Sequence, residues 1–250
     1  MSAWPNLVHF VTGAAVGAGV AAWGAVNPTS QLFGPAICCT PRANTLALTF
    51  DDGPNPAATP HILALLEKYN AKATFFLVGQ FARACPELVR EIAARGHCIG
   101  NHTEHHRNLT FLAPAAIEAE LRECQESIEA AANVATRWMR PPYGFRGPQL
   151  WGALRRAGLQ GVALWSLTCY DWKPQPASRL IDRLARVDAR RRHRSDSGEV
   201  VLLHDGDHKR LGADRGHVVS ALQHWLPRWR DSGVEFLTVD DIAKITSAAQ

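Results

Sequence analysis

Two adjacent carboxylates are the residues of this sequence best placed for chemistry. Asp51 and Asp52 follow the apolar run of residues 45–50, which is typical of a strand buried on both faces, and Gly53-Pro54 ends that run. Two like charges side by side repel each other unless a cation lies near them, and a metal ion is the first candidate. Asp-Gly-Pro is also common turn chemistry, so the pair alone does not decide between a turn and a site.

A histidine cluster, His102-Thr103-Glu104-His105-His106, could supply further metal ligands. His102 and His106 are four residues apart, so one helical turn would bring both imidazoles to one face. This is a known metal-chelating spacing; His105 is a weaker alternative, and a polar loop with ordinary histidines is the other interpretation. With one carboxylate of the aspartate pair, the two histidines would make the three-ligand set of a catalytic zinc site that keeps a position open for water.

The elements that must position these residues alternate between strands and helices. Strands are predicted at residues 45–50, 72–78, 97–101, 161–167, 199–203 and 234–239, and helices at residues 86–95, 114–133, 149–157, 177–190 and 218–230. Thr59-Pro60 is expected to open a further helix as its cap and first turn, and Asp240 to cap a short last one. This alternation predicts an α/β fold, a single-domain irregular (β/α) barrel of about seven strands with helices outside.

Barrels of this kind gather their chemistry at the carboxyl ends of the strands. Titratable or cationic groups follow five predicted strands, and the coincidence favours a site over a turn; they are Asp51 with Asp52, His102, Arg140, Asp171 and His204.

Five ordered motifs then resemble those of the polysaccharide deacetylases, the NodB-homology carbohydrate esterases. They are Thr49-Phe50-Asp51-Asp52-Gly53-Pro54, His102-Thr103-x-x-His106, Arg140-Pro141-Pro142-Tyr143-Gly144, Asp171-Trp172 and Leu202-Leu203-His204-Asp205. The resemblance covers about residues 45–244. It implies the deacetylase barrel and a metal-dependent hydrolase that removes N-acetyl groups from N-acetylglucosamine-type polysaccharides or oligosaccharides, chitin- or peptidoglycan-like.

The resemblance also implies roles for individual residues. Asp51 would be the catalytic base, and a divalent metal, zinc by default with cobalt or another ion as an alternative, would be held by Asp52, His102 and His106. Arg140 would lie against Asp51 and keep it ionised.

The remaining implied roles concern the leaving group and the substrate. His204 would protonate the departing amine and Asp171 would orient His204. Substrate contacts would come from the Tyr143 backbone N–H, facing the oxyanion, and from Leu202 and Trp172 as pocket walls. In the family another acid usually stands three residues before the Asp-Trp pair, but this chain has Thr168 there. Either Asp171 orients His204 alone, or His204 is tuned differently.

Three other functions remain open. An O-acetyl esterase acting on xylan, or a deformylase acting on a lipid-linked sugar, would need only the same acyl carbonyl and leaving group. A non-catalytic, membrane-tethered glycan-binding protein on the same barrel would be expected to lack Asp51 or His204, and both are present.

Of the other polar and aromatic residues, His208 is expected in an exposed loop with an optional substrate contact, Trp165 in the core, and the arginines of residues 183–194 on a solvated surface.

Residues 1–41 stand apart from the catalytic domain expected at residues 42–250, because they hold no Lys, Arg, Asp or Glu. Residues 7–26 are long enough to span a bilayer and predict a membrane anchor or export signal, with an apolar helix packed on the domain as the alternative. An extracytoplasmic location is favoured and a cytoplasmic one stays open. The net charge of +4 gives no reason to expect nucleic acid, and we expect a monomer whose six scattered cysteines are mostly buried thiols.

Overall fold

The parallel strands of the protein form an almost closed barrel. The structure, a computed structural model, describes residues 17–193 and 195–249. Within these ranges neighbouring strands pair in the order β1-β7-β6-β5-β4-β3-β9-β2, while β10 pairs with β3 and β8 with β9. The strands are β1 (Ala36–Ile37), β2 (Cys39–Thr40), β3 (Thr45–Gly53), β4 (Ala73–Leu77), β5 (Cys98–Asn101), β6 (Trp138–Met139), β7 (Gly161–Ala163), β8 (Leu167–Thr168), β9 (Gly198–His204) and β10 (Glu235–Phe236).

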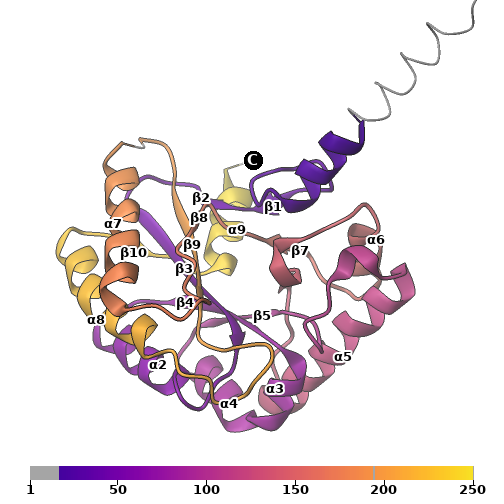
Figure 1. Cartoon of the computed structure of the whole chain (residues 1–250), viewed down its shortest axis with the longest axis horizontal. Helices are drawn as coiled ribbons and strands as arrows, with labels where there is room; N and C mark the ends of the chain where they lie inside the picture. The colour runs from indigo at the N-terminus through magenta and orange to yellow at the C-terminus, as the bar shows by residue number, and fades with distance from the viewer. Residues whose placement is uncertain (1–16, 194, 250) are drawn as a thin grey trace, which may run out of the picture.

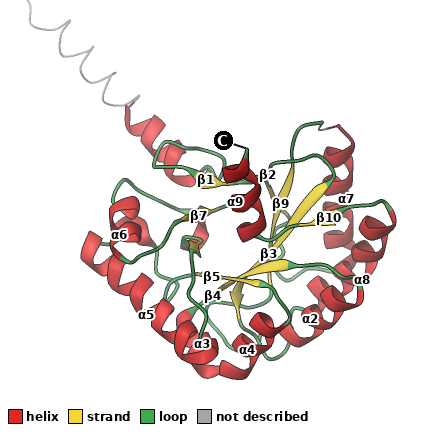
Figure 2. Ribbon diagram, turned by 180° about the vertical axis from the view of Figure 1, so that it is seen from behind, coloured by secondary structure: helices red, strands yellow, loops and turns green. Residues whose placement is uncertain are grey.

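The helices cover the outside of this barrel (Figures 1 and 2). They are α2 (Thr59–Lys68), α3 (Gly79–Ala84), α4 (Pro86–Ala94), α5 (Pro114–Ala132), α6 (Leu150–Arg156), α7 (Ala177–His193), α8 (Gly216–Asp231) and α9 (Val239–Ala248), with short 3-10 turns η1 (Leu109–Phe111) and η2 (Pro142–Gly144). The barrel prediction is therefore confirmed. At the two ends of the strand order, β1 pairs in parallel with β7 and β2 pairs antiparallel with β9.

The central strand β3 is buried along its whole length, as its unbroken apolar run predicts. It pairs in parallel with β4 and β9 over most of this length. The largest hydrophobic cluster lies between these strands and the surrounding helices, where the rings of Phe50 and Phe75 stack with centroids 5.0 Å apart. The site is thus carried by the best-buried part of the fold.

Several local predictions were wrong, and in two of them the residue contacts a distant part of the fold instead. Thr59 is the first helical residue of α2, not its cap, and its hydroxyl bonds Asp205 instead. Helix α9 is capped by Thr238 in a capping box with Asp241, while Asp240 accepts a hydrogen bond from the Trp138 indole. The single strand predicted at residues 161–167 is the two short strands β7 and β8, and α3 was not predicted.

The predicted burial of the cysteines holds only in part. Cys98, Cys124 and Cys169 are buried, but Cys38 and Cys85 are half-buried and Cys39 is exposed. Of the apolar run 7–26, residues 7–16 lie outside the described residues, whereas residues 17–26 form a helix that extends away from the barrel (Figure 1). None of the described helices is both long and apolar enough to cross a membrane.

Candidate active site

Both carboxylates of the aspartate pair face one site because β3 is irregular where it ends. Neighbouring side chains on a regular strand point to opposite faces. Here the pairing of β3 with β4 shifts register between Asp51 and Gly53, and Asp52 takes a left-handed φ of 68°. The backbone of Gly206 approaches so closely that a Cβ there would lie 1.8 Å from the Asp52 carbonyl oxygen. The bulge therefore depends on a glycine from the loop after β9.

Asp51 is paired with a fully buried arginine. The Arg140 Nη1 lies 2.7 Å from Asp51 Oδ1 and 2.8 Å from the Thr49 hydroxyl. The other guanidinium nitrogens donate to the carbonyl oxygens of Ala163 and Leu164, at 3.0 and 2.9 Å. Because this network fixes the guanidinium, Asp51 Oδ1 is held in place while Oδ2 faces His102 at 3.7 Å.

Asp52 faces the imidazoles instead. Its Oδ1 lies 3.5 Å from His102 Nε2 and 3.3 Å from His106 Nε2. The His102 Nδ1 lies 2.7 Å from the Arg140 carbonyl oxygen, which can only accept, so Nδ1 carries the hydrogen and Nε2 presents its lone pair to the site. His102 and His106 do not lie on a helical turn, as the spacing had predicted, but in a loop in which Thr103 and His106 have left-handed φ angles of 68° and 53°.

The donor atoms around Asp52 fit a divalent cation. Asp52 Oδ1 is buried without a hydrogen-bond partner in the described structure. Metal ligands about 2.1 Å from a tetrahedral ion stand about 3.4 Å from one another, which matches the spacings of 3.3 and 3.5 Å around Asp52 Oδ1. Burial would raise the pKa of Asp52, but the neighbouring histidines, His102 and His208 first, hold this pKa well below its usual range. For His106, burial and the nearby His102 lower the pKa to about 2. The carboxylate is thus anionic and the His106 ring neutral, as ligands must be.

His204 and Asp171 form a second charged pair. Asp171 Oδ2 accepts from the His204 backbone N–H at 2.6 Å, and its Oδ1 lies 3.0 Å from His204 Nδ1. Burial by itself lowers the pKa of His204, but Asp171 raises it, with smaller contributions from Asp52 and Asp51, to about 9. This geometry favours the first of the two alternatives left open by Thr168, because one carboxylate makes both orienting contacts.

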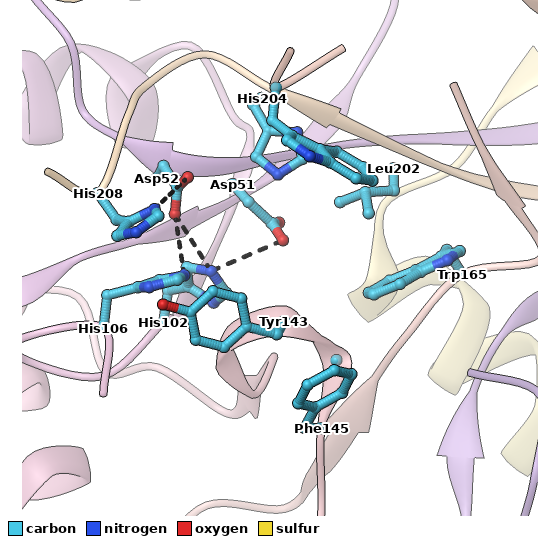
Figure 3. A pocket seen from close by; sticks show the side chains of 12 residues that line it. Asp51, Asp52, His102, His106, Tyr143, Phe145, Trp165, Leu202, His204 and His208 are labelled. Atoms are coloured by element: carbon cyan, nitrogen blue, oxygen red, sulfur yellow. Dashed lines mark ion pairs between the residues drawn. The ribbon is translucent and has the colours of Figure 1, made fainter. Parts of the chain in front are cut away.

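These groups line one pocket, a cavity of about 360 Å³ that Figure 3 shows from close by. Leu202 is buried in its wall and Trp172 is partly exposed at its edge, where the Trp172 ring meets His204 edge-on with centroids 5.4 Å apart. Tyr143 lies in η2 with a left-handed φ of 61°, and its ring packs on that of His106 at 4.8 Å. The structure therefore brings all ten predicted site residues to the same end of the barrel, eight of them as pocket walls and Arg140 and Asp171 directly behind Asp51 and His204.

Three further residues belong to this region although the sequence placed them elsewhere or passed over them. His208 was expected in an exposed loop, but it lies against Asp52 and His106. Trp165 was expected in the core; it does contact core clusters, but it also lines the pocket. Asp205, just after His204, is fully buried and accepts a hydrogen bond from Thr59, and burial raises its pKa to about 7. The signal available for Asp205 was its place in the last of the five motifs, and for His208 only its position four residues after His204.

Comparisons with known proteins place this geometry in context. A family model described as polysaccharide deacetylase matches residues 39–162. A peptidoglycan-N-acetylglucosamine deacetylase of Bacillus cereus is 32% identical over 200 residues, which cover 80% of this chain and 88% of that protein. A chitooligosaccharide deacetylase of Azorhizobium caulinodans is 34% identical over 177 residues, or 70% of this chain and 80% of that protein. The crystal structure of a peptidoglycan N-acetylglucosamine deacetylase in complex with 4-naphthalen-1-yl-N-oxidanyl-benzamide has a TM-score of 0.72 at 32% identity and covers 83% of this chain and 92% of that one.

Proposed function

The chain belongs to the polysaccharide deacetylase family, and from this premise we propose that it is a metal-dependent hydrolase that removes N-acetyl groups from N-acetylglucosamine-type polysaccharides or oligosaccharides. The observation that carries the proposal is that the two adjacent carboxylates have different partners. Asp51 is paired with Arg140, whereas Asp52 is surrounded by imidazoles. A hydrolase needs this asymmetry, since one carboxylate must hold a cation while the other stays free to take a proton.

The mechanism follows from the positions of the chain's own groups. Asp52, His102 and His106 would hold the cation, which when bound supplies a Lewis acid for the amide carbonyl and lowers the pKa of water. Asp51 takes the proton of the attacking water, and Arg140 holds the Asp51 carboxylate in place. His204, held protonated by Asp171 over the neutral pH range, donates its proton to the departing amine. No covalent bond to the enzyme is required, because base and acid are separate groups.

The pocket walls support an acetyl group as the part that enters. Beside its titratable groups the pocket is lined by Leu202, Trp165 and Trp172, which offer apolar surface to a methyl group. We propose that the Tyr143 backbone N–H faces the oxyanion that forms as water adds. The backbone of η2, with left-handed φ angles at Tyr143 and Gly144, is fixed by Trp165, whose ring would lie 2.4 Å from a Cβ on Gly144.

Acetate release from three substrates tests this function. Purified enzyme is incubated with chito-oligosaccharides, with peptidoglycan glycan strands and with acetylated xylan, and acetate and free amines are measured. Release of acetate together with free amines from either N-acetylated glycan is the expected result. Acetate released only from xylan would replace the proposal with an O-acetyl esterase, and release from none of them, with sugar binding retained, would favour a non-catalytic glycan-binding protein.

We propose zinc as the native ion, because two imidazoles and one carboxylate are a donor set that zinc favours, although cobalt and other divalent ions accept it as well. Metal analysis of enzyme purified without added metal tests the choice. We expect about one equivalent of zinc per chain. A different ion bound at the same stoichiometry would correct the identity of the metal, and the absence of any ion at full activity would contradict the mechanism.

We also propose that the apolar segment of residues 7–26 associates with a membrane and that the catalytic domain, residues 42–250, acts as a monomer. Support comes from the helix at residues 17–26, in which the side chains of Val20, Trp23 and Val26 are about half exposed although they are apolar. Fractionation of cells after a high-salt wash tests the association. Retention of the full chain with membranes, reduced in Trp23→Asp, is expected; release of the unaltered chain into the wash would contradict it.

A further inference from the structure

His208 is a titratable residue of the pocket to which the family-based roles give no task. It lies in the loop between β9 and α8, and its side chain is 25% exposed, whereas His102 and His106 are nearly fully buried. The His208 ring stacks on that of His106 with centroids 4.0 Å apart and planes 19° apart. It meets Tyr143 edge-on at 5.8 Å, so aromatic contacts hold it in the pocket. Figure 3 shows it beside His106 and turned toward Asp52.

The donor atoms of His208 lie where a further metal ligand would be needed. Ligand atoms of Asp52, His106 and His208 all stand within 4.8 Å of one another. The two oxygens of Asp52 face different residues. Oδ1 faces His102 and His106, while Oδ2 faces His208 Nδ1 at 3.5 Å. This distance is longer than an ordinary N–H···O hydrogen bond of about 2.9 Å, and it is close to the spacing of about 3.4 Å between neighbouring ligands of a tetrahedral ion.

From this arrangement, and resting on the metal-dependent function proposed above, we propose that His208 is a fourth protein ligand of the metal, so that the resting site holds three imidazoles and one carboxylate. His208 comes from a loop at the rim of the pocket, whereas the other ligands come from β3 and from a buried loop. Catalytic zinc sites usually keep one position open. A fourth ligand at the rim therefore retains the ion when the pocket is empty, and it is the ligand that can move aside for a substrate.

Counting the imidazoles around the metal tests the proposal without reference to activity. X-ray absorption spectra are recorded for the zinc-loaded wild type, for His208→Ala and for His61→Ala, which removes an exposed histidine of α2 outside the pocket. We expect three imidazoles in the wild type and in His61→Ala, and two in His208→Ala. Two imidazoles in all three proteins would overturn the proposal while leaving the metal-dependent function intact. A wild type that binds no metal would overturn both.

Metal affinity provides a second, independent readout. Competition with a chromogenic chelator gives the zinc dissociation constant of each protein. We expect His208→Ala to bind zinc at least about tenfold more weakly than the wild type and His61→Ala to bind it equally well, since even the outer partners of metal ligands change affinity by roughly 10- to 100-fold. An unchanged dissociation constant with a raised KM would assign His208 to substrate contact and overturn its role as a ligand. Circular dichroism of the metal-free proteins verifies that each variant is folded.

Discussion

Asp51→Asn and Asp52→Asn exchange the same atoms at neighbouring positions, and we expect them to have opposite consequences for metal binding. Asp51→Asn should still bind one equivalent of metal, because Asp52 and the imidazoles are untouched. Its kcat should fall by about 10²- to 10⁴-fold, the usual contribution of a general base. Asp52→Asn should lose the metal and its activity with it. Metal content is measured by elemental analysis, and kcat by acetate release.

Asp51→Asn also leaves the charge of Arg140 buried without its partner. Arg140 is 0% exposed and stands 2.7 Å from Asp51 Oδ1. Removing one member of a buried ion pair costs roughly 3–5 kcal/mol, and because Asn retains a hydrogen-bond acceptor we take about 3 kcal/mol. At about 2–4 °C per kcal/mol for a chain of this size, the Tm of the metal-free protein should drop by about 6–12 °C. Asp52→Asn should change this Tm less, because Asp52 faces only imidazoles, at 3.3 to 3.5 Å.

Thermal unfolding in excess chelator measures this difference without the contribution of bound metal. Three results would refute the reasoning: metal loss in Asp51→Asn equal to that in Asp52→Asn, activity of Asp51→Asn within tenfold of the wild type, or an unchanged Tm of metal-free Asp51→Asn. The first two would contradict the separate roles of the aspartates. The third would show that the pair with Arg140 does not stabilise the fold.

Other perturbations test the remaining parts of the site. Burial lowers the pKa of His204, but Asp171 raises it to about 9. Asp171→Asn should therefore move the basic limb of the kcat/KM profile, where the acid loses its proton, to lower pH by about 1–3 units. An unmoved limb would mean that another group is the acid. A pKa raised above the ordinary 6.5 adds stability that is complete below pH 6.5 and lost as pH rises through 9, so the Tm advantage of metal-free wild type over Asp171→Asn should shrink between pH 7 and 10. Gly206→Ala should lower the free energy of unfolding by about 1–3 kcal/mol and remove most of the activity, because its Cβ would press on the Asp52 carbonyl oxygen. The control Gly152→Ala in α6 should be tolerated. Equal denaturation midpoints for the two variants would contradict the close approach. Chelation should abolish acetate release, and added zinc should restore it.

The sequence predicted the barrel well because its signals are local. The unbroken apolar run of β3 and the helical periodicity of α5 reflect which faces are buried, and turn residues end most of the helices close to where the structure ends them. The carboxyl ends of parallel strands meet at one end of a barrel, so residues that follow different strands could be expected to meet. This reasoning placed Asp51 and His204 in one site although 152 positions of the chain lie between them.

Other features depended on contacts that no local pattern encodes. The left-handed backbone of Asp52 follows from the approach of Gly206, and the loop that holds His102 and His106 replaces the predicted helical turn. The sequence left open how His204 is oriented in a chain with Thr168, whereas the structure shows both oxygens of Asp171 on His204.

The sequence by itself thus determined which residues carry charge, which segments are buried and at which end of the barrel the charged residues gather. Only the tertiary structure decided how a register shift and the approach of Gly206 bring both aspartates to one site, and that His208, from a loop without periodicity, stacks on His106 beside Asp52. The physical reason is that the periodicity of burial can be read from residues that are close together in the sequence. The direction of a side chain at a strand end is instead set by the residues that pack against it from distant parts of the chain.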